Sequence, residues 1–221
     1  MRSIAIDGPA GAGKSTLARK IAGEMGFIYV DTGALYRTVA LYLLREGIAA
    51  SQTDMVEKAL KNIRVDIRFE DGVQQVYLNG EKVSDLIRTP QVSMMASSSS
   101  ALPCVRQFLL EQQRQMARAH DVVMDGRDIG TVVLPEADVK IFLTASPEER
   151  ARRRYEELVE KGQRVTFEEV LRDMRQRDAQ DENRAVAPLK PAEDALRVDT
   201  TGETLEQSVA RMTGLIRRHL G

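Results

Sequence analysis

The sequence predicts an α/β fold: a doubly wound parallel sheet with an inserted small antiparallel β lobe and a helical lid. Three observations lead to this prediction. Short apolar runs alternate with amphipathic helical patterns along most of the 221 residues. A glycine-rich turn, residues 8–15, stands between the first apolar run and the first helical pattern. Two hairpin turn signals, Asp71-Gly72 and Asn79-Gly80, interrupt the alternation in mid-chain.

The glycine-rich turn matches the phosphate-binding P-loop pattern, in which a glycine and four residues precede Gly-Lys-Ser or Gly-Lys-Thr. Residues 4–6 predict a buried strand before it, and residues 17–25 repeat apolar side chains at helical spacing behind it. Glycines let the backbone wrap closely around a phosphate, and the N-terminus of the next helix favours the anion. We therefore expect a nucleoside triphosphate to be bound by Gly8, Pro9, Ala10, Gly11, Ala12, Gly13, Lys14, Ser15 and Thr16.

Two side chains of this loop carry specific chemistry. Lys14 offers a mobile positive charge to the terminal phosphates, and Ser15 offers a hydroxyl to Mg²⁺. The alternative is a glycine-rich turn that only joins a strand to a helix. The match at every fixed position, with a strand and a helix on its two sides, favours the phosphate site.

Composition narrows the class of protein. The chain is 43% hydrophobic and 29% charged, which is ordinary for a soluble globular protein. Its net charge of −1 gives no overall electrostatic reason to bind nucleic acid or a membrane surface. The single cysteine, Cys104, fits a reducing cytosol, and no apolar run approaches the about 18 residues of a membrane span. We expect a cytoplasmic monomer that begins in a strand, with no room for a signal peptide.

Residues 27–30 predict a second strand, which would follow the first by a right-handed parallel crossover. Ligands bind such sheets at the carboxyl ends of the strands, so Asp31, Thr32 and Arg37 are expected at the same edge as the P-loop. The following helix has its apolar stripe at Leu35, Val39 and Leu43, and it is expected to end near Gly47.

The inserted lobe is expected at about residues 54–100. Asp54 and Glu57 have the spacing of a capping box for a short helix. Residues 63–69 alternate between apolar and charged side chains, as in a half-buried strand, and the hairpin signals flank residues 73–78. These features predict a small antiparallel meander.

The α/β pattern then resumes. Residues 91–117 predict a helix broken at Pro103, and strands are expected at residues 121–124, 139–143 and 196–198. Ser146 and Thr166 begin two helices, of which the second is expected to end at Pro188. Thr204 begins the last helix. The two helices within about residues 147–188 form the expected lid.

Phosphoryl transfer requires positioning and cations rather than covalent chemistry by the protein. Arg37 follows the second strand and Arg127 the third, so both are expected to face the P-loop, where a second phosphate would lie. The alternative for each arginine is a structural ion pair, with Asp31 or with Asp125. Asp125 itself would either hold Mg²⁺ through water or orient Arg127.

Arg177, Asp181 and Arg184 share one face of a lid helix, because they are four and three residues apart. A cationic flap that closes over the triphosphate and excludes water would use such residues. The alternative for these arginines is a solvated helix surface paired with neighbouring acids. Asp128, beside Arg127, is a candidate acceptor for an exocyclic amine of the substrate.

The motifs resemble those of the bacterial cytidylate kinases, a family of P-loop nucleoside monophosphate kinases. The resemblance spans nearly the whole chain, in order. It is carried by residues 6–15, by Asp31-Thr32-Gly33-Ala34-Leu35-Tyr36-Arg37, by residues 125–133, and by residues 177–189, which include Asn183-Arg184-Ala185-Val186-Ala187-Pro188-Leu189.

The resemblance implies one P-loop kinase domain over residues 1–221 that transfers the γ-phosphate of ATP to CMP or dCMP, with Mg²⁺, in pyrimidine nucleotide metabolism. It implies that Arg177 acts in the lid on the transferring phosphoryl group, and the expected catalytic residues are Lys14, Arg127 and Arg177. The family more often has serine at the position of Thr32, and some relatives have glycine at that of Ser15. The implied CMP-binding residues are Thr32, Arg37, Ser97, Arg106, Arg127, Asp128, Asp181 and Arg184, with Arg37 and Arg127 on the phosphate and Asp181 on the pentose.

Two other functions are compatible with a P-loop. The first is a kinase with a different acceptor, such as UMP, AMP or a small cyclic acid. The second is a nucleotide-dependent binding switch, which would need a guanine-selecting motif of the Asn-Lys-x-Asp type. The sequence contains no such motif, so the kinase interpretation is favoured.

Overall fold

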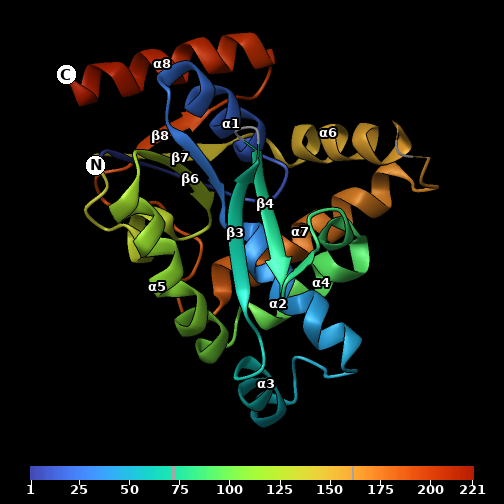
Figure 1. Ribbon diagram of the computed structural model, residues 1–221. Helices are drawn as coiled ribbons and strands as arrows, with labels where there is room; N and C mark the ends of the chain where they lie inside the picture. Colours follow the sequence, from blue (N-terminus) through green and yellow to red (C-terminus); the bar gives the residue numbers. More distant parts are fainter. Residues whose placement is uncertain (71–72, 161) are drawn as a thin grey trace.

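A computed structural model describes residues 1–70, 73–160 and 162–221 (Figure 1). At its centre is a five-stranded sheet whose neighbouring strands all pair in parallel, in the order β2-β6-β1-β7-β8. Later strands are added on both sides of β1, so the turn after β1 lies at the switch point of the sheet. The strands are β1 (Ser3–Asp7), β2 (Ile28–Asp31), β6 (Val122–Gly126), β7 (Val139–Thr144) and β8 (Leu196–Asp199).

Helices cover both faces of this sheet, which confirms the predicted doubly wound α/β fold. On one face, α1 (Lys14–Met25) and α8 (Leu205–Leu220) pack against Ile4, Ile6 and Ile141. On the other face, α5 (Pro103–Ala119) packs near Ala5 and Met124 (Figure 1). The inner strands β1 and β6 are largely buried on both faces, which explains why they appear in the sequence as short apolar runs.

The mid-chain insert forms a second, three-stranded antiparallel sheet, as predicted. Its core is continuous with that of α2, because Leu35, Val39 and Leu43 of α2 join the buried side chains of the insert. Asn79 and Gly80 have positive φ angles of 50° and 88° at one hairpin turn; the Asp71-Gly72 signal lies outside the described residues. The elements are α2 (Thr32–Arg45), α3 (Thr53–Leu60), β3 (Val65–Glu70), β4 (Val73–Leu78), β5 (Glu81–Lys82), the 3₁₀ helix η1 (Leu86–Arg88) and α4 (Pro90–Ser99).

Two late helices, α6 (Pro147–Glu160) and α7 (Phe167–Asn183), pack against each other. Tyr155 and Phe167 meet edge to face, with their ring centroids 6.4 Å apart. The same apolar cluster includes Ala10 of the P-loop, so these helices lie against the loop. The capping boxes predicted at Thr166 and Thr204 are both present. Within the described part of the chain, no helix is long and apolar enough to cross a membrane.

Two local predictions were wrong. Asp54 does not cap α3, because the helix already begins at Thr53, with the main-chain oxygen of Gln52 accepting hydrogen bonds from the N–H groups of Met55 and Val56. The helix α7 ends at Asn183 rather than at Pro188, because Arg184 already has an extended conformation (φ −65°, ψ 141°).

The 3₁₀ helix η1 and a single π-helical turn, η2 (Ile129–Val133), were not predicted. The turn η2 follows β6 after the two residues Arg127 and Asp128. Both carboxylate oxygens of Asp7, at the end of β1, accept hydrogen bonds from its first N–H groups, those of Ile129 and Gly130, at 2.7 Å each. Asp7 thereby fixes the loop that carries Arg127 and Asp128. Burial raises the pKa of the Asp7 carboxyl to about 6.

Candidate active site

The P-loop connects β1 to α1 through glycines that have positive φ angles, of 151° at Gly8 and 71° at Gly11. A Cβ on Gly8 would collide with the main-chain oxygen of Leu143, and one on Gly11 with the end of the Met174 side chain. Gly13, at the N-cap of α1, is left-handed and supplies no side-chain cap. The first N–H groups of α1 therefore remain available to an anion at this end of the helix.

A cleft of about 640 Å³ opens in front of the loop. Its lining includes ten lysine or arginine and five aspartate or glutamate side chains, although the whole chain has a net charge of −1. Positive charge is thus concentrated in this cleft. Most of the site residues expected from the sequence line it, and Gly8, Pro9 and Ala12 are buried behind its surface. The expected residues in the lining are Ala10, Gly11, Gly13, Lys14, Ser15, Thr16, Thr32, Arg37, Ser97, Arg106, Arg127, Asp128, Arg177, Asp181 and Arg184.

Lys14 is buried, and its Nζ donates a hydrogen bond of 2.7 Å to the main-chain oxygen of Pro9, within its own loop. Burial, followed by the positive charge of Arg127, lowers the pKa of Lys14 to about 7. The ammonium group is therefore poorly stabilised in the free protein, and an anion bound beside it would stabilise it.

Asp125, at the end of β6, accepts hydrogen bonds on both carboxylate oxygens. Ser15 Oγ donates to Oδ2 and the Tyr29 hydroxyl donates to Oδ1, each at 2.9 Å. The Thr32 hydroxyl donates to the main-chain oxygen of Asp125 at 2.7 Å. Burial, followed by the nearby charge of Asp31, raises the pKa of Asp125. Sequence reasoning did not single out Tyr29, although the two-residue period of a strand places it on the same face as Asp31.

Arg37, on α2, forms an ion pair with Asp31, with Nη2 2.9 Å from Oδ2. This is the structural pairing that the sequence offered as the alternative for Arg37. The pair does not saturate the guanidinium group, because Arg37 Nε is buried without a hydrogen-bond acceptor among the described residues. Arg88 of η1 also approaches Asp31, at 3.8 Å, and it was not identified from the sequence.

Arg127 pairs with Asp181 of α7 and not with Asp125, so that part of the alternative was wrong. Arg127 Nε lies 2.9 Å from Asp181 Oδ2, and Arg127 Nη1 donates to the main-chain oxygen of Gly126 at 3.3 Å. Asp125 is instead occupied by Ser15 and Tyr29. Sheet register brings Tyr29 and Asp125 together, and the packing of α7 supplies Asp181, so neither partner was evident from local spacing.

Asp128 lies between two buried guanidinium groups. It forms an ion pair with Arg106, and Arg184 Nη2 lies 3.6 Å from its Oδ1. The three side chains are only 6–8% exposed. Arg184 Nη2 has no hydrogen-bond acceptor in the described structure, and burial followed by the charge of Arg106 lowers the pKa of Arg184. Unused donor capacity therefore remains beside the Asp128 carboxylate.

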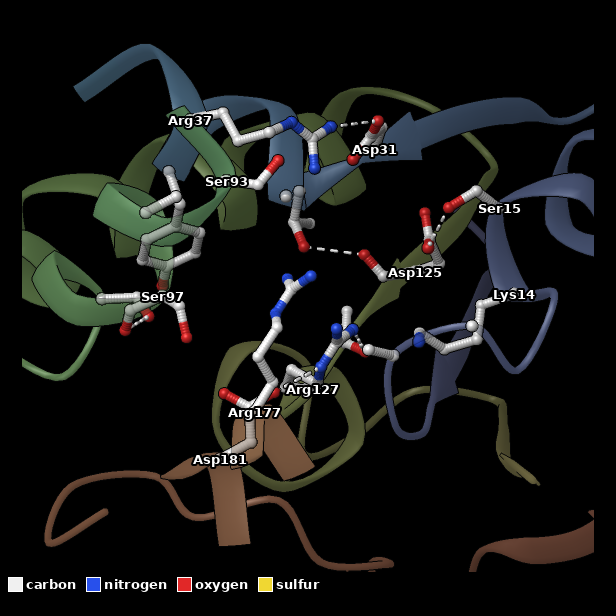
Figure 2. A pocket seen from close by; sticks show the side chains of 18 of the residues that line it. Lys14, Ser15, Asp31, Arg37, Ser93, Ser97, Asp125, Arg127, Arg177 and Asp181 are labelled. Atoms are coloured by element: carbon white, nitrogen blue, oxygen red, sulfur yellow. Dashed lines mark hydrogen bonds and ion pairs between the residues drawn. The ribbon is translucent and has the colours of Figure 1, made fainter. Parts of the chain in front are cut away.

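Arg177 reaches the cleft from α7, and Figure 2 shows it opposite Arg37 across the cavity. Burial, followed by the charge of Arg127, lowers the pKa of Arg177. Ser97 of α4 donates a long hydrogen bond of 3.5 Å to Gln180 of α7. Helices α4 and α7 therefore meet at the cleft.

Comparison with known proteins assigns the chain to a family. The family model described as cytidylate kinase matches residues 4–218. The chain is 51% identical to a cytidylate kinase from Carboxydothermus hydrogenoformans over 215 residues, which cover 97% of each protein. It is 50% identical to one from Caldanaerobacter subterraneus subsp. tengcongensis, over 98% of this chain and 95% of the relative.

A solved structure supports the fold alone. The uncharacterized protein from Eubacterium ventriosum matches with a TM-score of 0.54 over 98% of each chain, at 12% sequence identity. The family model and the full-length relatives are much more specific than this structural likeness. On their evidence, the chain belongs to the cytidylate kinase family.

Proposed function

We propose that the chain transfers the γ-phosphate of ATP to CMP or dCMP, giving ADP and CDP or dCDP. Membership of the cytidylate kinase family supports this reaction. One structural observation carries the proposal to individual residues. Lys14, Arg37, Arg127 and Arg177 come from four separate segments and converge on one cleft (Figure 2).

The reaction explains why such convergence is needed. The acceptor is a phosphate oxygen of CMP, which is already ionised near neutral pH, so the site requires no general base. It must instead bring two anions together. Two unit charges 4 Å apart interact by about 4 kcal/mol at an effective dielectric constant of about 20. Several fixed cations at similar distances offset this repulsion and stabilise the charge that spreads over the transferring group.

On the donor side, we assign the ATP phosphates to the loop of residues 8–16. The N–H groups at the start of α1 point at the anion, and Lys14 exchanges the main-chain oxygen of Pro9 for a phosphate oxygen. Arg177 of the lid then approaches the same phosphates. The complete set is Gly8, Pro9, Ala10, Gly11, Ala12, Gly13, Lys14, Ser15 and Thr16.

On the acceptor side, we assign the CMP phosphate to Arg37 and Arg127 and the pentose to Asp181. The cytosine contacts are assigned to Thr32, Ser97, Arg106, Asp128 and Arg184. Two buried donors support this assignment, because Arg37 Nε and Arg184 Nη2 lack acceptors in the described residues and a ligand would provide them. Cytosine presents an N4 amino donor that suits the Asp128 carboxylate, whereas uracil presents an O4 acceptor that would be repelled.

The residues also fit Mg²⁺, which binds oxygen ligands. When the ion is bound to phosphates, only a few of its ligands come from the protein. The Ser15 hydroxyl and the Asp125 carboxylate lie 2.9 Å apart beside the P-loop. We assign Ser15 as a ligand and Asp125 as the residue that holds Ser15, directly or through a bound water. The ion would neutralise phosphate charge and orient the triphosphate.

We further propose that about residues 54–100 form the CMP-binding lobe and about residues 147–188 the lid. The cleft supports this division, since the insert contributes Arg88 and Ser97 and the late helices contribute Arg154 and Arg177. We also propose that the protein acts as a monomer. The single cysteine favours the cytoplasm.

The proposal is tested by measuring ADP release from ATP and Mg²⁺ with CMP, dCMP, UMP, AMP or no acceptor. CMP and dCMP should give the highest kcat/KM. A preference for AMP or UMP would favour the kinase with another acceptor. Slow hydrolysis that no acceptor accelerates would favour the binding switch.

A further inference from the structure

Tyr29 contacts Asp125, which is one of the residues that line the cleft. It lies on β2 opposite Val123 of β6, and Asp125 is two residues further along β6 on the same face of the sheet. A diagonal neighbour at this distance is within reach of an aromatic side chain. The Tyr29 ring packs against the apolar cluster between the sheet and α1, and its hydroxyl donates to Asp125 Oδ1 at 2.9 Å.

The helix α1 also contacts the ring through Arg19. Arg19 and Ser15 are one helical turn apart, so they face the same way. The Arg19 guanidinium carbon lies 5.3 Å from the centroid of the Tyr29 ring, in a cation–π contact, while Ser15 Oγ donates to Asp125 Oδ2. The ring is therefore fixed by the sheet, by α1 and by its own hydrogen bond.

The pair of hydrogen bonds fixes the plane of the Asp125 carboxylate. A single hydrogen bond from Ser15 would leave the carboxylate free to rotate about its Cβ–Cγ bond. A second donor on the opposite oxygen removes that freedom. The orientation of Asp125 in turn decides that of Ser15, because the single hydroxyl proton of Ser15 points at Oδ2 and its lone pairs are directed elsewhere.

We propose that Tyr29 is a positioning residue for Mg²⁺-dependent nucleotide binding, which acts through Asp125 on Ser15. This inference rests on the proposed function, in which Ser15 is a ligand of the nucleotide-bound metal. Tyr29 orients Asp125, and Asp125 orients Ser15. Removing a residue that hydrogen-bonds to the ligands of a metal commonly lowers metal affinity by about 10–100-fold.

The test separates the metal from the nucleotide. ADP affinity is measured by titration calorimetry in Mg²⁺ and in EDTA, for the wild type and for Tyr29→Phe. In EDTA the variant should bind ADP as tightly as the wild type does. The increase in ADP affinity that Mg²⁺ causes should be about tenfold smaller in the variant than in the wild type. Tyr155→Phe is the matched control. It also removes a tyrosine hydroxyl, but from a residue of α6 that packs against Phe167 of α7, and it should behave as the wild type.

A double-mutant cycle distinguishes positioning from a general structural effect. In an Asp125→Asn background, Tyr29→Phe should cause no further loss of the Mg²⁺ gain. Three results would each overturn the proposal. The Mg²⁺-dependent increase in ADP affinity could be unchanged in Tyr29→Phe, or the variant could lose as much ADP affinity in EDTA as in Mg²⁺. The third is that Tyr29→Phe lowers this increase further in the Asp125→Asn background. Failure of the proposed function is a different result: a wild type that binds ADP but phosphorylates no CMP.

Discussion

Arg127 Nε lies 2.9 Å from Asp181 Oδ2, which joins the loop after β6 to α7 at the cleft. Both residues belong to the proposed CMP site, one on the phosphate and one on the pentose. Asp181 has a second basic neighbour, because Arg184 Nη1 lies 3.8 Å from its Oδ1. Loss of Arg127 would therefore not leave Asp181 without a cation beside it. The pairing allows the catalytic role of Arg127 to be tested without unfolding the protein.

Arg127→Ala should lower kcat by about 10²–10³-fold, because a fixed cation directed at the transferring phosphate is removed. The melting temperature should change by less than about 4 °C, which corresponds to roughly 1 kcal/mol in a chain of this size. Steady-state kinetics and thermal unfolding measure the two quantities. Arg118→Ala, which removes an exposed arginine paired with Glu111 on α5, is the control and should leave kcat unchanged. A loss of kcat below about threefold would remove Arg127 from the site.

Asp128→Asn should weaken the binding of CMP and leave the binding of ADP unchanged. The asparagine variant is preferable to alanine, because it keeps a side-chain oxygen that can accept a hydrogen bond from the buried guanidinium groups of Arg106 or Arg184, whereas alanine would remove that acceptor. The KM for CMP should rise at least about tenfold, as expected for a lost charge-assisted hydrogen bond.

The same variant should narrow the preference for CMP over UMP, since an asparagine amide can donate to O4 of uracil. Kinetics with CMP and UMP give the KM for CMP and the preference for CMP over UMP, and calorimetry gives the affinity for ADP. Equal losses of CMP and ADP affinity would contradict a role in base recognition.

Lys14 should take up a proton when ADP or ATP binds. Its pKa of about 7 in the free protein leaves the amine mostly neutral at pH 8, and contact with phosphate raises that pKa. Proton uptake approaching one per site is therefore expected at pH 8. It is measured as the difference in binding enthalpy between two buffers of different ionisation enthalpy. Lys14→Arg, which stays charged, should show no uptake, and equal enthalpies for the wild type in both buffers would refute the prediction.

Asp7 should make the folding stability depend on pH in the acidic range. Its folded pKa of about 6 exceeds the ordinary value of 3.8, so the fold favours the neutral carboxyl. This contribution is complete below pH 3.8 and is lost as the pH rises through 6. The unfolding free energy of the wild type, relative to Asp7→Asn, should therefore fall by up to about 3 kcal/mol between pH 4 and pH 7.5. Urea titrations measure it, and a relative stability that increases with pH would disprove the assignment.

Local patterns predicted most of the fold. The inner strands β1 and β6 are largely apolar because both of their faces are covered, and Thr166 and Thr204 begin helices through contacts three residues away. Failures came where distant residues decide the local structure. The turn η2 has no local signal, because its first N–H groups are capped by Asp7 at the end of the neighbouring strand β1.

The residues that line the cleft were largely predictable, and so was the pairing of Arg37 with Asp31, but the pairing of Arg127 was not. The motif residues Arg37, Arg127 and Arg177 all line the cleft, as expected from strand ends and helix spacing. The partner of Arg127 depends on how β6 and α7 are placed in space, which spacing along the chain does not encode. For the same reason Tyr29, whose importance depends on strand register, was not recognised from the sequence.

The most direct test of the account follows the γ-phosphate itself. ATP labelled at the γ-position is incubated with the protein, Mg²⁺ and CMP, and the products are separated by chromatography. The account predicts that the label passes to CDP, with one ADP formed for each CDP. Label that appears only in inorganic phosphate, at a rate indifferent to CMP, would contradict it.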